Sequence, residues 1–204
     1  QDSVAEEMLY VLENADVKYA IVQNQEQTDK LLEIKDRLPN LEHICYEEPR
    51  GMRNYPKDYI HYYKDIQKNG ETFQSENPDF FLSEIEKNHG RDIAIFLYTS
   101  GTTGNPKGVV LTFDNLIISS RNGIKFDSLT SEEEVLAYLP MAWVGDNIFS
   151  FGQAYVAGFC VNCPENSETV TTDLKEIGPT YYFAPPAIYE NVLTKVMIRM
   201  EDAG

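Results

Sequence analysis

The hydrophobic pattern in the first quarter of the chain predicts helices that alternate with short strands. Apolar residues recur at helical spacing over residues 4–15, after a capping box that places the helix N-cap at Ser3. A second helix is predicted over 25–38, and short apolar runs predict strands over 19–22 and 41–46. Helix and strand in alternation are typical of a parallel α/β sheet.

The pattern is lost over residues 49–91, which contain glycines, prolines and many charged residues. Tyrosines are interleaved with them at Tyr55, Tyr59, Tyr62 and Tyr63. We interpret this stretch as an irregular surface excursion with one short helix, whose tyrosines pack against the body of the protein. The alternative is that the tyrosines form an aromatic patch that binds a ligand.

Regular elements return at Asp92 and continue to the end of the chain. Strands are predicted over 92–98, 108–111, 135–139, 159–163 and 181–184, and helices over 112–123, 146–156 and 187–201. The predicted fold class is α/β, with a largely parallel sheet flanked by helices. We divide the chain into an α/β segment (1–48), the irregular excursion (49–91) and a final segment (92–204).

Charge and composition narrow the choice of function. The 204 residues include 33 acidic and 17 basic ones, for a net charge of −16, and 42% are hydrophobic. Such a composition excludes a disordered chain, and the acidic excess argues against a nucleic-acid-binding surface. No apolar run is long enough to span a membrane. No polybasic or amphipathic anchor is evident either, so peripheral membrane association is left open without support.

The cysteine content bears on the cellular compartment, and the start of the sequence bears on whether it is part of a longer protein. The three cysteines, Cys45, Cys160 and Cys163, are too few to indicate a disulfide framework, so we expect a reducing, cytoplasmic compartment. The sequence begins without Met and in the middle of a pattern, which we interpret as a piece of a longer protein.

The most informative stretch lies between two predicted strands. It reads Tyr98-Thr99-Ser100-Gly101-Thr102-Thr103-Gly104-Asn105-Pro106-Lys107-Gly108. Glycines let backbone N–H groups approach a ligand closely, and hydroxyls donate to phosphate oxygens without adding charge. Lys107 is the only basic residue between Arg91 and Arg121, and it adds a point charge for a polyphosphate. The stretch therefore predicts a phosphate-binding loop.

Two common nucleotide motifs are excluded by spacing. The P-loop requires Gly-Lys-Ser/Thr at its end, but here Pro106 precedes Lys107 and Gly108 follows it. The three glycines also do not match the GxGxxG spacing. Because the loop joins strand to strand, it lacks a helix N-terminus, and hydroxyl side chains must contribute more of the binding. The plain structural alternative is a hairpin turn rich in serine, threonine and glycine.

This stretch resembles the phosphate-binding signature of the adenylate-forming superfamily, which includes acyl-CoA synthetases, luciferases and peptide-synthetase adenylation domains. The sequence matches that signature at every fixed position. The continuation over 109–116 also resembles the family, with Phe113 where the family often has His. The resemblance covers nearly the whole chain and implies an incomplete, internal piece of the large N-terminal domain. It implies that Lys107 is catalytic and that it binds the ATP phosphates together with Thr99, Ser100, Gly101, Thr102, Thr103 and Gly104.

Two further segments resemble the fatty acyl-CoA synthetase branch of the superfamily. Residues 139–143 resemble its Leu-Pro-Leu-x-His segment at the acyl pocket, with Trp143 in the place of His. Asp146 falls where that group often carries an acid, and residues 179–190 resemble a second segment. The resemblance thus assigns Trp143 and Asp146 to the acyl pocket. The alternatives are a core tryptophan and a helix-capping aspartate.

The resemblance implies ATP-dependent activation of a carboxylic acid, of the fatty type, to acyl-AMP, followed by transfer to coenzyme A. It implies ATP, Mg²⁺ and coenzyme A as substrates and cofactors, and small molecules as the partners. The family's Mg²⁺-binding Glu, ribose-binding Asp and second Lys have no counterpart in the sequence, so no metal ligand is assigned and this piece alone is expected not to complete catalysis. The alternatives are an acyl-AMP ligase that loads a carrier protein and a non-catalytic nucleotide-binding relative.

Overall fold

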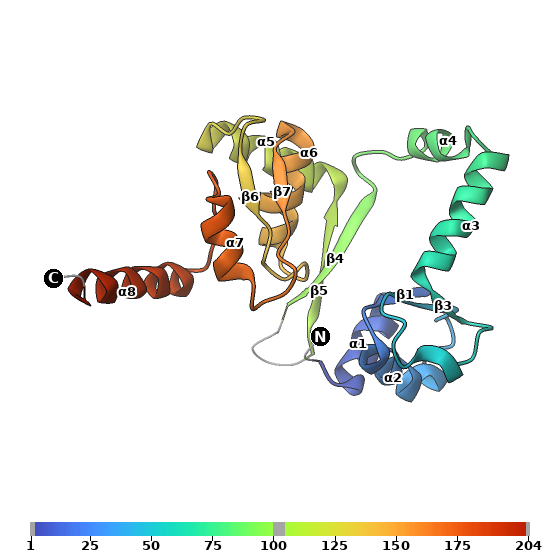
Figure 1. The fold of residues 1–204 in the computed structure, drawn as a ribbon. Coiled ribbons are helices and arrows are strands. Elements are labelled where there is room, and N and C mark those ends of the chain that lie inside the picture. Colours follow the sequence, from blue (N-terminus) through green and yellow to red (C-terminus); the bar gives the residue numbers. More distant parts are fainter. Residues whose placement is uncertain (1–2, 100–104, 203–204) are drawn as a thin grey trace. The chain divides into compact units, whose positions relative to one another are not determined.

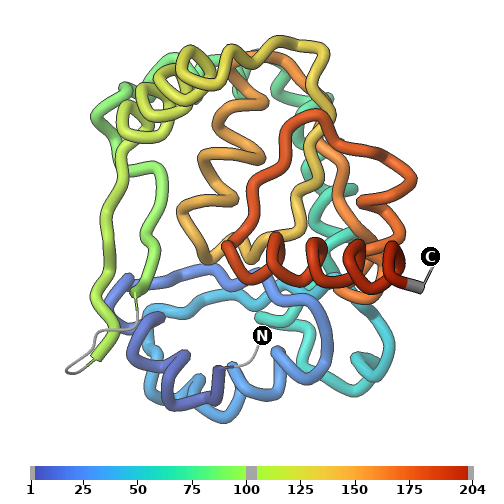
Figure 2. The backbone as a smooth tube through the Cα atoms, turned by 90° about the vertical axis from the view of Figure 1, so that its left-hand side faces the viewer, coloured from blue at the N-terminus to red at the C-terminus, as the bar shows by residue number. Residues whose placement is uncertain are grey.

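The computed structural model describes residues 3–99 and 105–202 (Figure 1). The chain divides into two compact units, one formed by residues 1–92 with 98–110 and the other by 93–97 with 111–204. The fold is mixed α/β with parallel strands, as the sequence predicted. Figure 2 follows the backbone through the elements of each unit, which are described separately below.

A three-stranded parallel sheet forms the centre of the first unit, in the order β1-β2-β3. Its strands are β1 (Tyr19–Val22), β2 (His43–Tyr46) and β3 (Ile60–Tyr62). The helices of this unit are α1 (Ala5–Asn14), α2 (Gln25–Ile34), α3 (Tyr63–Glu76) and α4 (Phe80–Glu86). Because β1 and β2 are joined through α2, the connection is a βαβ crossover of the kind that parallel strands require.

The core of the first unit lies between this sheet and the helices α1 and α2. Leu31 and Ile34 on α2, Leu41 before β2 and Ile44 on β2 are each at most 1% exposed. They belong to one hydrophobic cluster that also includes Leu9 of α1. The apolar positions that predicted α2 from the sequence are therefore the positions that it buries.

The start of α1 differs from the prediction by one residue. The N-cap is Val4 rather than Ser3, and its backbone N–H donates to the carboxylate of Glu7 at 3.4 Å. Glu6, the predicted partner of the N-cap, instead pairs with Arg37 at 2.5 Å. The Glu6 carboxylate therefore binds the Arg37 side chain and not the backbone N–H at the start of the helix.

Residues 49–91 are not irregular, so that expectation is wrong. They contain β3, α3 and α4, and α3 alone spans 14 residues. No residue of α3 is buried, which explains why a search for apolar periodicity missed it. The expectation that the tyrosines pack on the body is confirmed for Tyr55 and Tyr59, which contact the hydrophobic core. Tyr62 stacks on Tyr46 with ring centroids 5.5 Å apart.

In the second unit, α5 (Phe113–Asp127) begins at Thr112, whose hydroxyl accepts from the backbone N–H of Asn115. A short parallel sheet pairs β6 (Glu134–Leu136) with β7 (Cys160–Asn162). The other helices are a π-helix (Asp146–Gly152), α6 (Gln153–Ala157), α7 (Val170–Ile177) and α8 (Pro186–Asp202). The strand predicted over 181–184 is reduced to one bridge between Tyr181 and Val135.

Close contact between helices holds the second unit together. Gly152, at the end of the π-helix, lies against Ser120 of α5, and a side-chain carbon at position 152 would lie 2.4 Å from the Ser120 hydroxyl oxygen. Gln153, which is fully buried, covers Gly123 in the same way. Glycine is required at position 152 because any larger residue would push the two helices apart.

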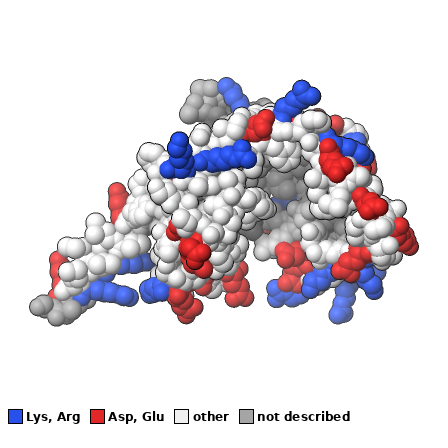
Figure 3. Space-filling view, turned by 90° about the horizontal axis from the view of Figure 1, so that it is seen from above, with Lys and Arg blue, Asp and Glu red and all other residues white. Residues whose placement is uncertain are grey.

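The surface carries both signs of charge. Figure 3 shows acidic side chains interspersed with basic ones over the visible face. Among the described residues, no helix combines the length and the apolar character needed to cross a membrane.

We predict that Gly152→Ala in the full-length protein lowers the free energy of unfolding by about 1–3 kcal/mol, because the added methyl group overpacks the contact with Ser120. Urea unfolding followed by circular dichroism measures this change.

Gly70→Ala is the matched control. Gly70 lies within α3, and a side-chain carbon there meets no atom within 4 Å. The same substitution is therefore expected to raise the stability by about 0.5–1 kcal/mol through helix propensity alone. Equal effects at the two positions would contradict the close contact at Gly152.

Candidate functional site

The predicted phosphate loop joins two paired strands. β4 (Ile93–Thr99) pairs with β5 (Lys107–Thr112), and the Thr99 hydroxyl lies 3.5 Å from the carbonyl oxygen of Lys107, to which it donates. The strands thus come together where the loop begins and ends. The predicted phosphate-binding residues Ser100, Gly101, Thr102, Thr103 and Gly104 lie outside the described residues.

Tyr98 holds the two ends of the loop and ties them to α1. Its ring lies over Gly108, where a side-chain carbon would be 3.2 Å from the ring carbon Cζ. Its hydroxyl donates to Oδ1 of Asn14, the last residue of α1, at 2.7 Å. Partial burial raises the pKa of Tyr98, so the hydroxyl keeps the proton that it donates. The strand before the loop and the strand after it are therefore braced against one helix.

Sequence reasoning did not identify Asn14 as part of this arrangement. It lies 84 positions from Tyr98, and nothing in the local pattern of α1 distinguishes it. A cavity of about 690 Å³ lies beside Tyr98. It is lined by residues of α1 and by Asn105 and Pro106, which precede β5.

Lys107 is the charged group at the end of the loop. Its side chain is exposed and makes no ion pair with any described residue, so its ammonium is available to an anion. Hydroxyl groups, glycine backbone and one free cation are donors that suit a phosphate chain.

The second predicted site residue is Trp143, in the second unit. Trp143 is 53% exposed in the part of the protein that the structure describes. The side-chain amide of Asn147 donates to the carbonyl oxygens of Met141 and Trp143, at 2.8 and 3.0 Å. These two bonds fix the turn that presents the indole at the surface of its unit.

Asp146 lies at the start of the π-helix and is only 2% exposed. It accepts a hydrogen bond from the Ser150 hydroxyl at 2.8 Å, and not from a backbone N–H, so it does not cap the helix. Burial raises the pKa of this carboxyl group, and the bond from Ser150 opposes that change only in part. π-helical turns occur frequently at functional sites, because the wider turn redirects side chains.

Aromatic packing joins the π-helix, which contains Asp146, to the segment 179–190. Phe149 of the π-helix stacks on Phe183 with ring centroids 4.1 Å apart. Gly145 lies under the same ring, where a side-chain carbon would be 3.1 Å from Phe183. The structure thus brings residues 145–149 together with residue 183 and builds an apolar wall beside Asp146.

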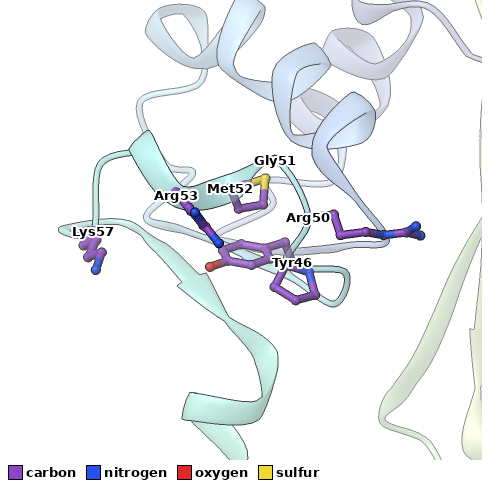
Figure 4. Close-up of a pocket in the computed structure, with 7 residues that line it drawn as sticks. Tyr46, Arg50, Gly51, Met52, Arg53 and Lys57 are labelled. Carbon is purple, nitrogen blue, oxygen red and sulfur yellow. The ribbon is translucent and has the colours of Figure 1, made fainter.

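A further cavity of about 610 Å³, in the first unit, follows the carboxyl end of β2 (Figure 4). Arg53 extends toward the ring of Tyr46, whereas Arg50 pairs with Glu48 at 3.0 Å. Gly51, with φ of +81°, lies against Gln25 and shapes the turn. Sequence reasoning did not identify this cavity, although its signal is visible as basic residues closely spaced in an acidic chain.

The described side chains do not form a metal site. Over residues 3–99 and 105–202, no group of three His, Cys, Asp or Glu side chains is arranged to bind a metal ion.

Comparison with known sequences identifies a family over almost the whole chain. The sequence model for the family described as AMP-binding enzyme matches residues 1–203. The long-chain-fatty-acid–CoA ligase ACSBG1 of Rattus norvegicus is 28% identical over 197 residues, and ACSBG2 of Xenopus laevis is 28% identical over 203. These alignments cover 92% and 94% of this chain, but 26% of each relative. The chain thus spans about a quarter of the length of these relatives.

Solved structures share the fold. A long-chain-fatty-acid CoA ligase from Rhodopseudomonas palustris, described as putative, superposes with a TM-score of 0.71 at 14% identity, over 94% of this chain and 44% of that one. The anthranilate CoA ligase AuaEII in complex with anthranoyl-AMP gives 0.66 at 20% identity, over 90% and 33%. The chain therefore has the fold of a piece of these larger enzymes.

We predict that Tyr98→Phe lowers the free energy of unfolding by about 1 kcal/mol, because the hydrogen bond to Asn14 is lost. Asn14→Ala is expected to cost a similar amount, and the two changes together less than their sum. Urea unfolding of the four proteins in the cycle measures the coupling. Tyr155→Phe is the control, because Tyr155 is 83% exposed. If the two losses of unfolding free energy add strictly, Tyr98 and Asn14 do not interact, and the proposed link between the loop ends and α1 is refuted.

We predict a pH-dependent effect of Asp146→Asn. The pKa of this carboxyl group is higher in the folded than in the unfolded chain, so its contribution to stability is full below the unfolded value and is lost as the pH rises through the folded value. At pH 8 the asparagine variant is therefore expected to be more stable than the wild type by about 1 kcal/mol, because it buries no charged carboxylate. The advantage shrinks toward pH 4.

Unfolding by urea at several pH values, with the exposed Asp58→Asn as control, measures this difference. An advantage that does not change with pH would contradict a raised pKa at Asp146.

Proposed function

The chain belongs to the AMP-binding enzyme family, and from this premise we propose that the full-length protein activates a fatty acid with ATP and transfers the acyl group to coenzyme A. The observation that carries the proposal is the stretch from Tyr98 to Gly108, in which hydroxyls, glycines and Lys107 stand between two paired strands. The names of the relatives, which are long-chain-fatty-acid–CoA ligases, support the fatty substrate.

The chemistry follows from the weakness of a carboxylate as an electrophile. In the first step a carboxylate oxygen attacks the α-phosphorus of ATP, the bond to the bridging oxygen breaks, and pyrophosphate leaves with the electron pair. The product is acyl-AMP, a mixed anhydride. In the second step the sulfur of coenzyme A attacks the acyl carbon, AMP leaves, and the thiol proton passes to solvent. The first step depends mainly on positioning and charge neutralisation.

The loop residues have distinct roles in this proposal. Ser100, Thr102 and Thr103, together with the backbone N–H groups of Gly101 and Gly104, donate to the β- and γ-phosphates. Thr99 exchanges its bond to the Lys107 carbonyl oxygen for one to a phosphate oxygen. Lys107 balances the charge that develops on the departing pyrophosphate. The position of Lys107 directly after the loop, exposed and without a paired acid among the described residues, supports that role.

The acyl group is assigned to the second unit. Trp143 and Asp146 border the acyl site, next to the apolar wall of Phe149 and Phe183. An exposed indole on a turn fixed by Asn147 offers a flat apolar surface to a hydrocarbon chain. Magnesium is the usual partner of ATP, and one or two carboxylates together with the ATP phosphates would suffice to hold it.

We predict that Lys107→Ala in the full-length enzyme lowers the rate of acid-dependent ATP–pyrophosphate exchange by about 10²–10³-fold, because one charged contact to the transition state is lost. Exchange of labelled pyrophosphate into ATP measures the rate. Lys125→Ala on α5 is the matched control, since it removes an exposed lysine that makes no ion pair with a described residue. Wild-type exchange in Lys107→Ala would remove this lysine from the mechanism.

A further inference from the structure

A largely apolar hollow of the second unit lies between α7 and α8. Its volume is about 660 Å³, within the range typical of small-molecule sites. The apolar residues that line it include Val170, Leu174, Ile188, Val192 and Val196. Figure 1 shows α7 and α8 as neighbouring helices in this unit. We call this hollow the α7–α8 groove.

Two tyrosines form the aromatic part of the groove. The Tyr138 hydroxyl is hydrogen-bonded to the protein, so its ring contributes mainly apolar surface. Tyr138 and Tyr182 are stacked, with ring centroids 5.5 Å apart. The Tyr138 hydroxyl donates to the carbonyl oxygen of Phe183 at 3.3 Å, so it already has a partner. Tyr189 packs its ring edge against Tyr182 and donates to the Tyr182 carbonyl oxygen at 2.8 Å. The groove therefore presents ring faces and aliphatic groups to an occupant.

The charged residues that line the groove are all basic. They are Lys175 of α7 and Lys195 and Arg199 of α8. From residue 91 onward the chain has seven basic residues, so nearly half of them gather here, although acidic residues are twice as common over the same stretch. None of the three makes an ion pair with a described residue.

Apolar lining and unpaired cations together define the chemistry of an occupant. The apolar surface favours an occupant with a hydrocarbon body, because such an occupant removes exposed apolar surface from contact with water. Val192 and Val196 are 41% and 48% exposed, so such area is available. The cations favour an anionic group at one end of that body. A neutral lipid or a cationic ligand would leave the three charges unmatched.

We propose that the α7–α8 groove binds a single long-chain carboxylate, at a site distinct from the one where Trp143 and Asp146 are placed. The lining of the groove includes neither of those residues, nor Phe149 of the apolar wall. In this proposal a fatty acid bound in the groove is not the one that reacts.

The experiment uses the full-length protein and a photoreactive palmitate that carries a diazirine in its chain. After irradiation, the cross-linked peptides are mapped by mass spectrometry. Labelling is expected on peptides that contain α7 and α8, and excess palmitate is expected to remove it. Hexadecanol, which has the same chain without the carboxylate, is expected to compete at least about tenfold more weakly.

A double variant tests the cations. Lys195→Gln with Arg199→Gln is expected to reduce labelling of α7 and α8 at least about tenfold while leaving ATP–pyrophosphate exchange unchanged. The matched control is Arg121→Gln with Lys125→Gln on α5, which removes the same charge elsewhere in this unit. Circular dichroism and thermal unfolding show that both double variants are folded.

Several outcomes would overturn the proposal. Labelling confined to peptides around Trp143 would mean that the chain has a single fatty acid site. Absence of labelling would mean that the groove is closed, for instance by another part of the polypeptide. Equal competition by hexadecanol, or unchanged labelling in the α8 variant, would refute the role of the cations. If the wild type shows no exchange but α8 is labelled, the proposed ligase activity fails and the groove stands.

Discussion

The contact of Tyr98 with Gly108 and Asn14 is the constraint that holds together the two strand ends beside the predicted phosphate loop. By packing on Gly108 and donating to Asn14, Tyr98 fixes the residues on both sides of the loop to the end of α1. Tyr98 thus holds the two ends of the predicted phosphate loop in place, although the loop leads into a strand and not into a helix N-terminus.

The second unit relies on a different constraint, the absence of side chains where helices touch. Gly152 and Gly123 let the π-helix, α6 and α5 approach so closely that Ser120 and Gln153 fill the remaining space. The same π-helix buries Asp146 against the Ser150 hydroxyl and directs Phe149 onto Phe183. The seven residues of the π-helix thus provide the tight contact at Gly152, the buried carboxyl group of Asp146 and the stacked ring of Phe149.

The sequence predicted most elements that bury an apolar stripe. α2 and β2 lie near their predicted positions because Leu31, Ile34 and Ile44 both set the pattern and fill the core, and α5 begins at the predicted cap, Thr112. α3 could not be found in this way, since it buries nothing, and the partner of Tyr98 could not be found because a contact across 84 positions leaves no local pattern. The loop motif itself was visible because several residue types are specified together, whereas the exposure of Trp143 depends on a turn that Asn147 fixes.

In the proposed mechanism the loop between β4 and β5 binds the phosphates of ATP so that a carboxylate can be adenylated. The most direct test is exchange of labelled pyrophosphate into ATP by the full-length protein, measured with and without a panel of fatty acids. The claim predicts exchange that requires both the protein and an acid, with AMP as a product of the complete reaction. Failure of every acid in the panel to support exchange, or cleavage of ATP to ADP and phosphate, would contradict it.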